Sequence, residues 1–163
     1  MRSKTCCFTG HRYLPEKQKE EIMRTLESAV LSLIHSGYRY FGAGGALGFD
    51  TLAAQMVLHL RQSYPDIKLI LVLPCISQSD KWSRADVAVY QEIMEQADKV
   101  VYTSHEYTAG CMFKRNRHLV DHSSACICYL EKATGGTAYT VNYARKCGLK
   151  IINLTEEQNK TPL

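Results

Sequence analysis

The chain has 163 residues, 45% of them hydrophobic, and its 20 lysines and arginines exceed its 16 aspartates and glutamates, which gives a net charge of +4. This length suits one folded domain with a buried core, and we expect residues 1–163 to form a single domain. The mild positive charge favours a small anionic molecule as partner and does not call for a nucleic acid.

No apolar run approaches the ~20 residues that a membrane-spanning helix needs. The N-terminus leads into a strand-like run instead of a secretory signal, so we expect a cytoplasmic protein without a membrane partner. The seven cysteines are odd in number and lack CxxC spacing. They favour ordinary reduced, buried thiols, with metal or redox roles as the lesser alternative, and no metal site is predicted.

The first strand-turn-helix unit lies at the N-terminus. An apolar run over 5–8 predicts a buried strand, and Thr9 and Gly10 begin the turn that ends it. Apolar residues then recur at steps of three and four from about Pro15 to Ser36, which predicts a helix that Gly37 ends.

The same order repeats along the chain. Residues 38–41 predict a strand, 42–48 a glycine turn and 50–64 a helix. The aliphatic run 68–73 is typical of a strand covered on both faces, and we expect it near the centre of the sheet. Further helices are predicted over 83–96, 112–123 and 139–147, further strands over 99–102, 125–130 and 150–154, and a polar tail that frays over 155–163.

Strands that alternate with helices of this length predict an α/β fold. We expect a Rossmann-like, doubly wound and mainly parallel sheet of about six strands in a three-layer sandwich. In such sheets ligands bind beyond the carboxyl ends of the strands, where the strand order reverses.

Glycines and polar residues follow several of the predicted strands. Backbone amides at helix N-termini attract anions, and glycine lets a phosphate approach the main chain, so we predict that these loops bind a nucleotide-like ligand. The predicted loop residues are Thr9, Gly10, His11 and Arg12; Gly44, Gly45, Gly48 and Asp50; Pro74 and Trp82; and Gly135, Gly136 and Thr137.

Each of these loops has a simpler interpretation beside the functional one. The turn 42–48 reads GxGGxxG, which is neither a dinucleotide fingerprint nor a P-loop, so its glycines either contact phosphate or only tighten the turn. Asp50 is either a helix N-cap or a contact to ribose or metal. His11 and Arg12 either supply a donor and a charge to an anion or form a solvated loop pair.

Arg115 and Asn116 open a predicted helix, with Lys114 and Arg117 beside them. This basic cluster either faces phosphate or forms an exposed turn. Trp82 follows the strand at 68–73, where it either stacks on a base or packs against the core or a lid.

Taken in order, these turns resemble the SLOG superfamily, a Rossmann-like group that includes the DNA-processing protein DprA and the Lonely Guy phosphoribohydrolases. The YpsA-like branch is the most similar. The resemblance implies a Rossmann-like fold with a pocket for a nucleotide or nucleotide-derived ligand. It rests on Thr9-Gly10-His11-Arg12, Gly44-Gly45-Ala46-Leu47-Gly48-Phe49-Asp50, Leu73-Pro74-Cys75, Arg115-Asn116 and Thr134-Gly135-Gly136-Thr137.

The resemblance leaves catalysis open. In the phosphoribohydrolases an arginine and a glutamate are catalytic; Arg115 matches that arginine, but Asn116 replaces the adjacent lysine, and Val141 and Asn142 stand where glutamates are found. The catalytic residues are therefore unassigned, with Arg115 and Asp50 as candidates. Other carboxylates that could reach the pocket are Asp80, Asp86 and Glu131.

Three hypotheses follow. The first is binding or sensing of a nucleotide or nucleotide-derived ligand, with no certain cofactor. The second is hydrolysis of a nucleotide N-glycosidic bond, and the third, a lesser one, is binding of single-stranded DNA. Some SLOG relatives are dimers, which adds a homodimer formed through an apolar helix face to the expectations.

Overall fold

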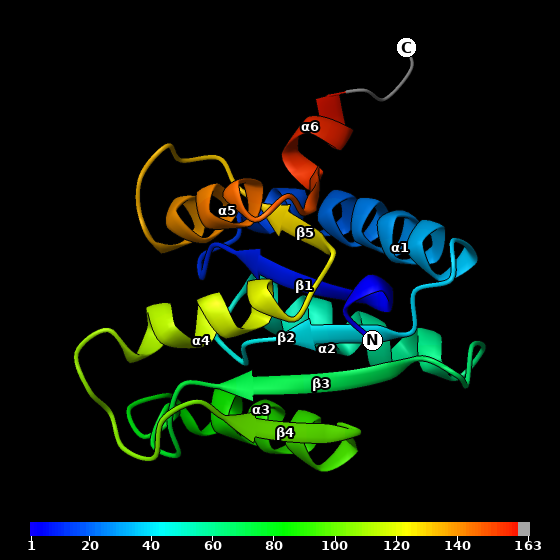
Figure 1. The fold of residues 1–163 in the computed structure, drawn as a ribbon. Helices are drawn as coiled ribbons and strands as arrows, with labels where there is room; N and C mark the ends of the chain where they lie inside the picture. Colours follow the sequence, from blue (N-terminus) through cyan, green and yellow to red (C-terminus); the bar gives the residue numbers. More distant parts are fainter. Residues whose placement is uncertain (160–163) are drawn as a thin grey trace.

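Six strands form one parallel sheet in the computed structural model, which describes residues 1–159 (Figure 1). Their order across the sheet is β4-β3-β2-β1-β5-β6, and every neighbouring pair runs parallel. The predicted α/β class and the strand number are confirmed. The strands are β1 (Thr5–Gly10), β2 (Tyr40–Ala43), β3 (Lys68–Leu73), β4 (Lys99–Tyr102), β5 (Ala125–Tyr129) and β6 (Lys150–Asn153).

The strand order reverses beside β1. From β1 the chain builds outward through β2, β3 and β4, and then returns to place β5 on the other side of β1. The loops after β1 and β5 therefore lead to helices on opposite faces of the sheet, which opens a crevice between them.

Helices cover both faces of the sheet and make the three layers predicted. α4 and α5 pack on one face, while α1, α2 and α3 pack on the other, with α6 against α1 (Figure 1). The helices are α1 (Lys19–His35), α2 (Phe49–Arg61), α3 (Arg84–Gln96), α4 (Cys111–Asp121), α5 (Gly136–Lys146) and α6 (Leu154–Asn159), with two short 3-10 helices, η1 (Arg2–Lys4) and η2 (Glu16–Gln18).

The core is divided by the sheet. Phe8, Phe41 and Phe49 are fully buried on the side of α1, α2 and α3 and pack ring against ring. The opposite side buries Cys126, Val141 and other small side chains under α4 and α5. The most central strands are β1 and β2, so the expected central position of 68–73 is wrong: β3 lies one place from the edge, and α2 and α4, which contact it from opposite faces, supply the cover that its aliphatic sequence requires.

Several segment boundaries differ from the predictions. The strand expected over 38–41 is β2, Tyr40–Ala43, which takes in the first two residues of the expected turn 42–48. Two other differences have local reasons. The helix expected from Pro15 starts as η2 and becomes α-helical only at Lys19. The helix expected from Tyr139 begins at Gly136, because Gly135 turns the chain with a φ of 104° and serves as its N-cap.

The polar tail was expected to fray, which is wrong for residues 155–159, because they belong to α6. The side chain of Asn153 accepts a hydrogen bond from the Thr155 amide at 3.2 Å, as an N-cap does, and Leu154 is fully buried against α1. Residues 160–163 lie outside the described part of the chain.

Six of the seven thiols are buried, and all seven are free. Within residues 1–159 no group of three or more His, Cys, Asp or Glu side chains is arranged to hold a metal ion. No helix in the same part of the chain combines the length and apolarity that crossing a lipid bilayer requires.

Candidate functional site

A cleft of about 640 Å³ opens at the carboxyl edge of the sheet, between the loops that follow β1 and β5. We call it the central cleft; it lies where the strand order reverses. It brings together ten of the predicted site residues from four loops and helices: Thr9, Gly10, His11, Arg12, Asp50, Arg115, Asn116, Gly135, Gly136 and Thr137.

A second cavity of about 450 Å³ lies between α2 and α3, on the other side of the segment Arg12–Leu14. It is lined by three of the other five predicted residues, Gly45, Gly48 and Trp82, and it shares Arg12 and Asp50 with the central cleft. Two predicted residues line neither space: Gly44 lies under the Arg115 guanidinium, and Pro74 is buried after β3.

Arg115 is the buried cation of the central cleft. It lies in the first half of α4 and lines the cleft, yet only 4% of its surface is exposed. Its Nη1 donates to the Gly44 carbonyl and, at 3.4 Å, to Gln78, while its Nε donates to Asn116 at 2.7 Å. Burial lowers the pKa of Arg115, and the nearby Asp50 charge opposes that effect.

Within the described part of the chain no carboxylate forms an ion pair with this guanidinium. The ion pairs within residues 1–159 all lie elsewhere, on α1 and around Asp98. Among residues 1–159, the Nη2 of Arg115 donates a hydrogen bond to the Met112 sulfur alone, at 3.7 Å. A buried charge without an ion-pair partner is costly, so this guanidinium favours a bound anion at the cleft.

Asp50 lies in the first turn of α2 and is 7% exposed. The N-cap of α2 is Gly48, so the capping interpretation of Asp50 is wrong; its carboxylate instead accepts a long bond of 3.4 Å from the Ala46 amide. Burial raises the pKa of Asp50 from 3.8 to about 6, against the opposing influence of Arg115, the Ala46 amide and Arg12. This carboxyl group is therefore suited to exchanging a proton near neutral pH.

His11 joins the two loops that border the cleft. Its Nε2 accepts a hydrogen bond from the Glu131 amide at 2.9 Å, which places the proton of the neutral ring on Nδ1. Burial lowers the pKa of His11, with the Lys132 charge acting in the same direction. His11 thus joins the loops after β1 and β5 as a neutral ring, while the exposed Arg12 beside it supplies the positive charge.

Glu131 is a second carboxylate on the cleft wall. It accepts a hydrogen bond of 2.6 Å from the Tyr129 hydroxyl, which also lies 2.9 Å from the Gln18 side-chain oxygen. Burial and the bond to Glu131 raise the pKa of Tyr129. The contact fixes the Glu131 side chain at the mouth of the cleft.

The predicted glycines divide into two groups by their surroundings. A Cβ on Gly10 would lie 2.5 Å from Phe49, and one on Gly44 would lie 2.6 Å from Arg115, so the chain's own packing excludes a side chain there. Gly48 has a φ of 79° and lies against the Arg12 carbonyl. By contrast, a Cβ on Gly136 meets no atom within 4 Å, and Gly136 lines the central cleft.

The N-terminus of α5 faces this space without a capping side chain. The Gly135 N-cap makes no side-chain hydrogen bond, and the first turn holds no acidic residue. The Tyr139 amide donates to the carbonyl of the Gly135 N-cap at 3.0 Å, as in the first turn of an α-helix. The preceding amides are therefore oriented as helix N-termini are when they receive an anion.

Sequence reasoning missed several residues of the cleft wall. Tyr13, Met112 and Lys132 line it, but none belongs to a glycine turn or to a recognised motif. The position of Lys132 directly after β5 was the signal that could have found it, since all loops after parallel strands reach the same edge.

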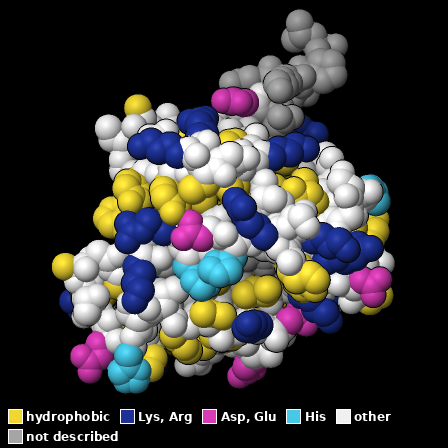
Figure 2. Space-filling view, viewed as in Figure 1, with side chains coloured by type: hydrophobic (Ala, Val, Ile, Leu, Met, Phe, Trp, Pro, Cys, Tyr) yellow, Lys and Arg dark blue, Asp and Glu magenta, His cyan; other side chains and the backbone are white. Residues whose placement is uncertain are grey.

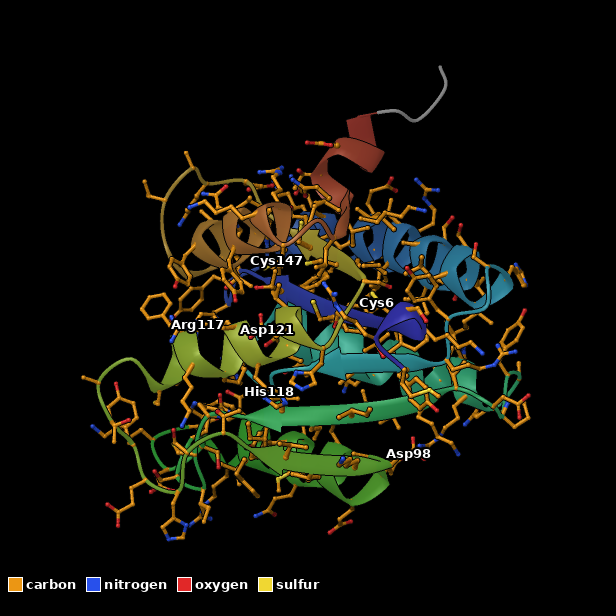
Figure 3. All side chains as sticks on the ribbon, viewed as in Figure 1. Cys6, Asp98, Arg117, His118, Asp121 and Cys147 are labelled. Atoms are coloured by element: carbon orange, nitrogen blue, oxygen red, sulfur yellow. The ribbon has the colours of Figure 1, made fainter. Side chains whose placement is uncertain are left out.

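A separate charged group lies on the outer side of α4. Arg117, His118 and Asp121 follow one another along this helix in Figure 3, and they line a shallow surface hollow together with Lys114. Arg117 donates to the Tyr139 hydroxyl at 3.0 Å instead of pointing into the cleft. On this face Figure 2 shows Lys and Arg side chains dispersed among hydrophobic and acidic ones.

The fold and the cleft define a Rossmann-like α/β protein with an anion-suited crevice where its strand order reverses. The sequence model of the YpsA family, described as the YspA SLOG family, matches residues 9–155. The chain belongs to this family, which confirms the resemblance found in the sequence.

Two relatives match most of the chain. A UPF0398 protein of Halalkalibacterium halodurans is 31% identical over 128 residues, which are 77% of this chain and 68% of the relative. The prophage-derived protein YoqJ of Bacillus subtilis is 28% identical over 142 residues, which cover 80% of this chain and 81% of that protein.

Two solved structures share the fold. DNA processing protein A from Helicobacter pylori, reported for its single-stranded DNA binding mode, aligns with a TM-score of 0.63 at 18% identity, over 96% of this chain and 71% of that one. The Streptococcus pneumoniae protein of the same name aligns with a TM-score of 0.64 at 15% identity, over 91% of this chain and 49% of that one.

Proposed function

We propose that the central cleft binds the phosphate of a nucleotide or nucleotide-derived molecule, and that the chain acts by binding or sensing this ligand. The observation that carries the proposal is Arg115, a buried guanidinium on the cleft wall that pairs with no carboxylate within residues 1–159. Phosphate and arginine form strong, charge-assisted hydrogen bonds, so a phosphate in the cleft would offset the cost of burying this charge.

The N-terminus of α5 supports the same ligand chemistry. Its first residues, with the open space at Gly136, line the cleft together with Gly10. Arg12 and Lys132 add exposed positive charge at the mouth. Two independent anion-binding features thus border one space.

Isothermal titration calorimetry tests the proposal with AMP, ADP-ribose, NAD, a cyclic dinucleotide and inorganic phosphate. Arg115→Met should weaken the binding of whichever nucleotide binds by about tenfold to a hundredfold, the value of a charged hydrogen bond. The matched control is Arg117→Met, because Arg117 lies on the same helix but outside the cleft. Absence of binding across the panel, or equal losses in both variants, would refute the proposal.

A second variant guards against misfolding of Arg115→Met. Gly136→Ala puts a methyl group into space that no protein atom fills, so it should preserve the melting temperature and still weaken nucleotide binding. Asn142→Ala, an exposed change on the same helix, should alter neither quantity.

Hydrolysis of a nucleotide N-glycosidic bond is the second candidate function, and Asp50 favours it. This buried carboxyl group, with a pKa of about 6, has the proton affinity of a general acid or base. Release of free base from nucleoside monophosphates would reveal the activity, and Asp50→Asn should reduce it by about 10²–10⁴-fold. An inert protein across a nucleotide panel would leave binding as its role.

Single-stranded DNA is a further candidate because the Helicobacter pylori protein of the same fold is reported to bind it. A strand needs a continuous basic track, and on the face shown in Figure 2 the cations are dispersed. Tight binding of an oligonucleotide that weakens steeply with salt would favour DNA over a mononucleotide.

A further inference from the structure

The second cavity has walls of a different chemistry from those of the central cleft. Leu52, Val89 and Ile93 line it with aliphatic surface, and Trp82 adds an aromatic ring. Trp82 is half-buried and stands edge-on to Tyr90, with ring centroids 5.1 Å apart at 77°. A cavity with such walls accepts a flat, weakly polar group more readily than a phosphate.

The two spaces adjoin and share part of their walls. Both are lined by the segment Arg12–Leu14 and by Asp50. Within residues 1–159 the Asp50 carboxylate accepts only the long bond from Ala46, so it keeps acceptor capacity at the point where the spaces meet.

Hydrogen bonds also connect the two walls. Arg115 donates to the Gln78 oxygen at 3.4 Å, and the Gln78 nitrogen donates to the Tyr90 hydroxyl at 3.2 Å. Because the Tyr90 ring packs against Trp82, these contacts link the Arg115 guanidinium in the cleft wall to the Trp82 indole in the cavity wall. The linked side chains fix how far apart the anion and the flat group would lie.

We infer that the second cavity binds the heterocyclic base of the same molecule whose phosphate occupies the central cleft, and that Asp50 accepts a hydrogen bond from a sugar hydroxyl between them. The inference rests on the proposed phosphate site and narrows the ligand to a nucleoside phosphate. Aromatic rings stack on every kind of nucleic-acid base, so Trp82 supplies affinity for the base whatever its identity.

The single tryptophan of the chain makes a direct test available, because its fluorescence reports on this cavity alone. AMP, GMP, CMP and UMP are compared with ribose 5-phosphate, which carries the sugar and phosphate but no base. At least one of the four nucleotides should change the Trp82 emission and bind about tenfold to a hundredfold more tightly than ribose 5-phosphate. Ribose 5-phosphate should bind without changing the emission.

Calorimetry on variants separates stacking from other effects. Trp82→Ala should bring the ratio of nucleotide to ribose 5-phosphate affinity close to one, whereas Trp82→Phe should retain most of it. Tyr107→Ala removes an exposed aromatic ring outside both spaces and should leave the ratio unchanged. Circular dichroism confirms that each variant is folded.

Two results overturn the inference in different ways. If ribose 5-phosphate binds as tightly as every nucleotide, or if the ratio survives in Trp82→Ala, the base lies elsewhere while the phosphate site stands. If neither ribose 5-phosphate nor any nucleotide binds, the phosphate site itself is wrong, and the base site falls with it.

Discussion

Replacing Asp50 by asparagine should stabilise the folded protein at neutral pH. The folded environment raises the pKa of Asp50 from 3.8 to about 6, so above pH 6 the fold carries a buried carboxylate that it tolerates poorly. At 1.36 kcal/mol per pH unit this rise corresponds to about 3 kcal/mol. Asparagine keeps the shape of the side chain without the charge, so Asp50→Asn should recover a large part of that free energy.

The sign of the pH dependence follows from the same values. Between pH 3.8 and about 6 the folded state binds the proton of Asp50 more readily than the unfolded state does. The contribution of this group to stability therefore grows as the pH falls through about 6 and is complete near 3.8.

Urea unfolding of the original protein and of Asp50→Asn, from pH 4 to 8, measures the difference between the two free energies of unfolding. Subtracting one free energy from the other removes the contributions of the groups that the two proteins share. The asparagine variant should be the more stable by ~2–3 kcal/mol at pH 7, with the difference shrinking towards pH 4. A variant that is less stable at pH 7, or a difference that does not change with pH, would refute the electrostatic description of the cleft.

Three further predictions concern the parts that shape the cleft. Gly10→Ala should destabilise the fold by about 1–3 kcal/mol in denaturant unfolding, because its Cβ would overlap the buried Phe49, and unchanged stability would contradict that packing. Asn153→Ala should cost about 1–2 kcal/mol and increase hydrogen exchange in α6, since the amide caps that helix and bonds to the Leu130 backbone; normal protection of α6 would argue against the cap. His11 should titrate below pH 6.5 in an NMR experiment, with its proton on Nδ1 at neutral pH, and a higher midpoint would show that the bond from the Glu131 amide is wrong.

The elements of the fold were predictable because their signals are local. The apolar spacing before Gly37 and the aliphatic run 68–73 each indicate one element without reference to the rest of the chain. The position of a strand within the sheet is not local. β3 lies one place from the edge of the sheet, and α2 and α4 contact it from opposite faces; no pattern inside 68–73 records that position.

The location of the cleft was predictable for a similar reason, since loops after parallel strands reach one edge. The role of each glycine was not. Gly44 has no side chain because the guanidinium of Arg115, 71 positions away along the chain, occupies that space. Gly136, like Gly44, is one of two adjacent glycines in a turn after a strand, but it borders open space. Only the folded structure distinguishes the two positions.

The end of the chain shows the same limit. The polar composition of 155–163 suggests a frayed tail, and the N-cap that starts α6 is a single asparagine, Asn153, at the end of a strand. Its helix is held by Leu154 against α1, a contact between distant segments.

A crystal structure with the nucleotide that binds most tightly in the calorimetry panel tests the central claim most directly. We expect its phosphate within hydrogen-bonding distance of the Arg115 guanidinium and of the amides of Gly136 and Thr137. A phosphate bound on the outer side of α4, beside Arg117 and His118, or a central cleft that stays free of this nucleotide at saturating concentration, would contradict the claim.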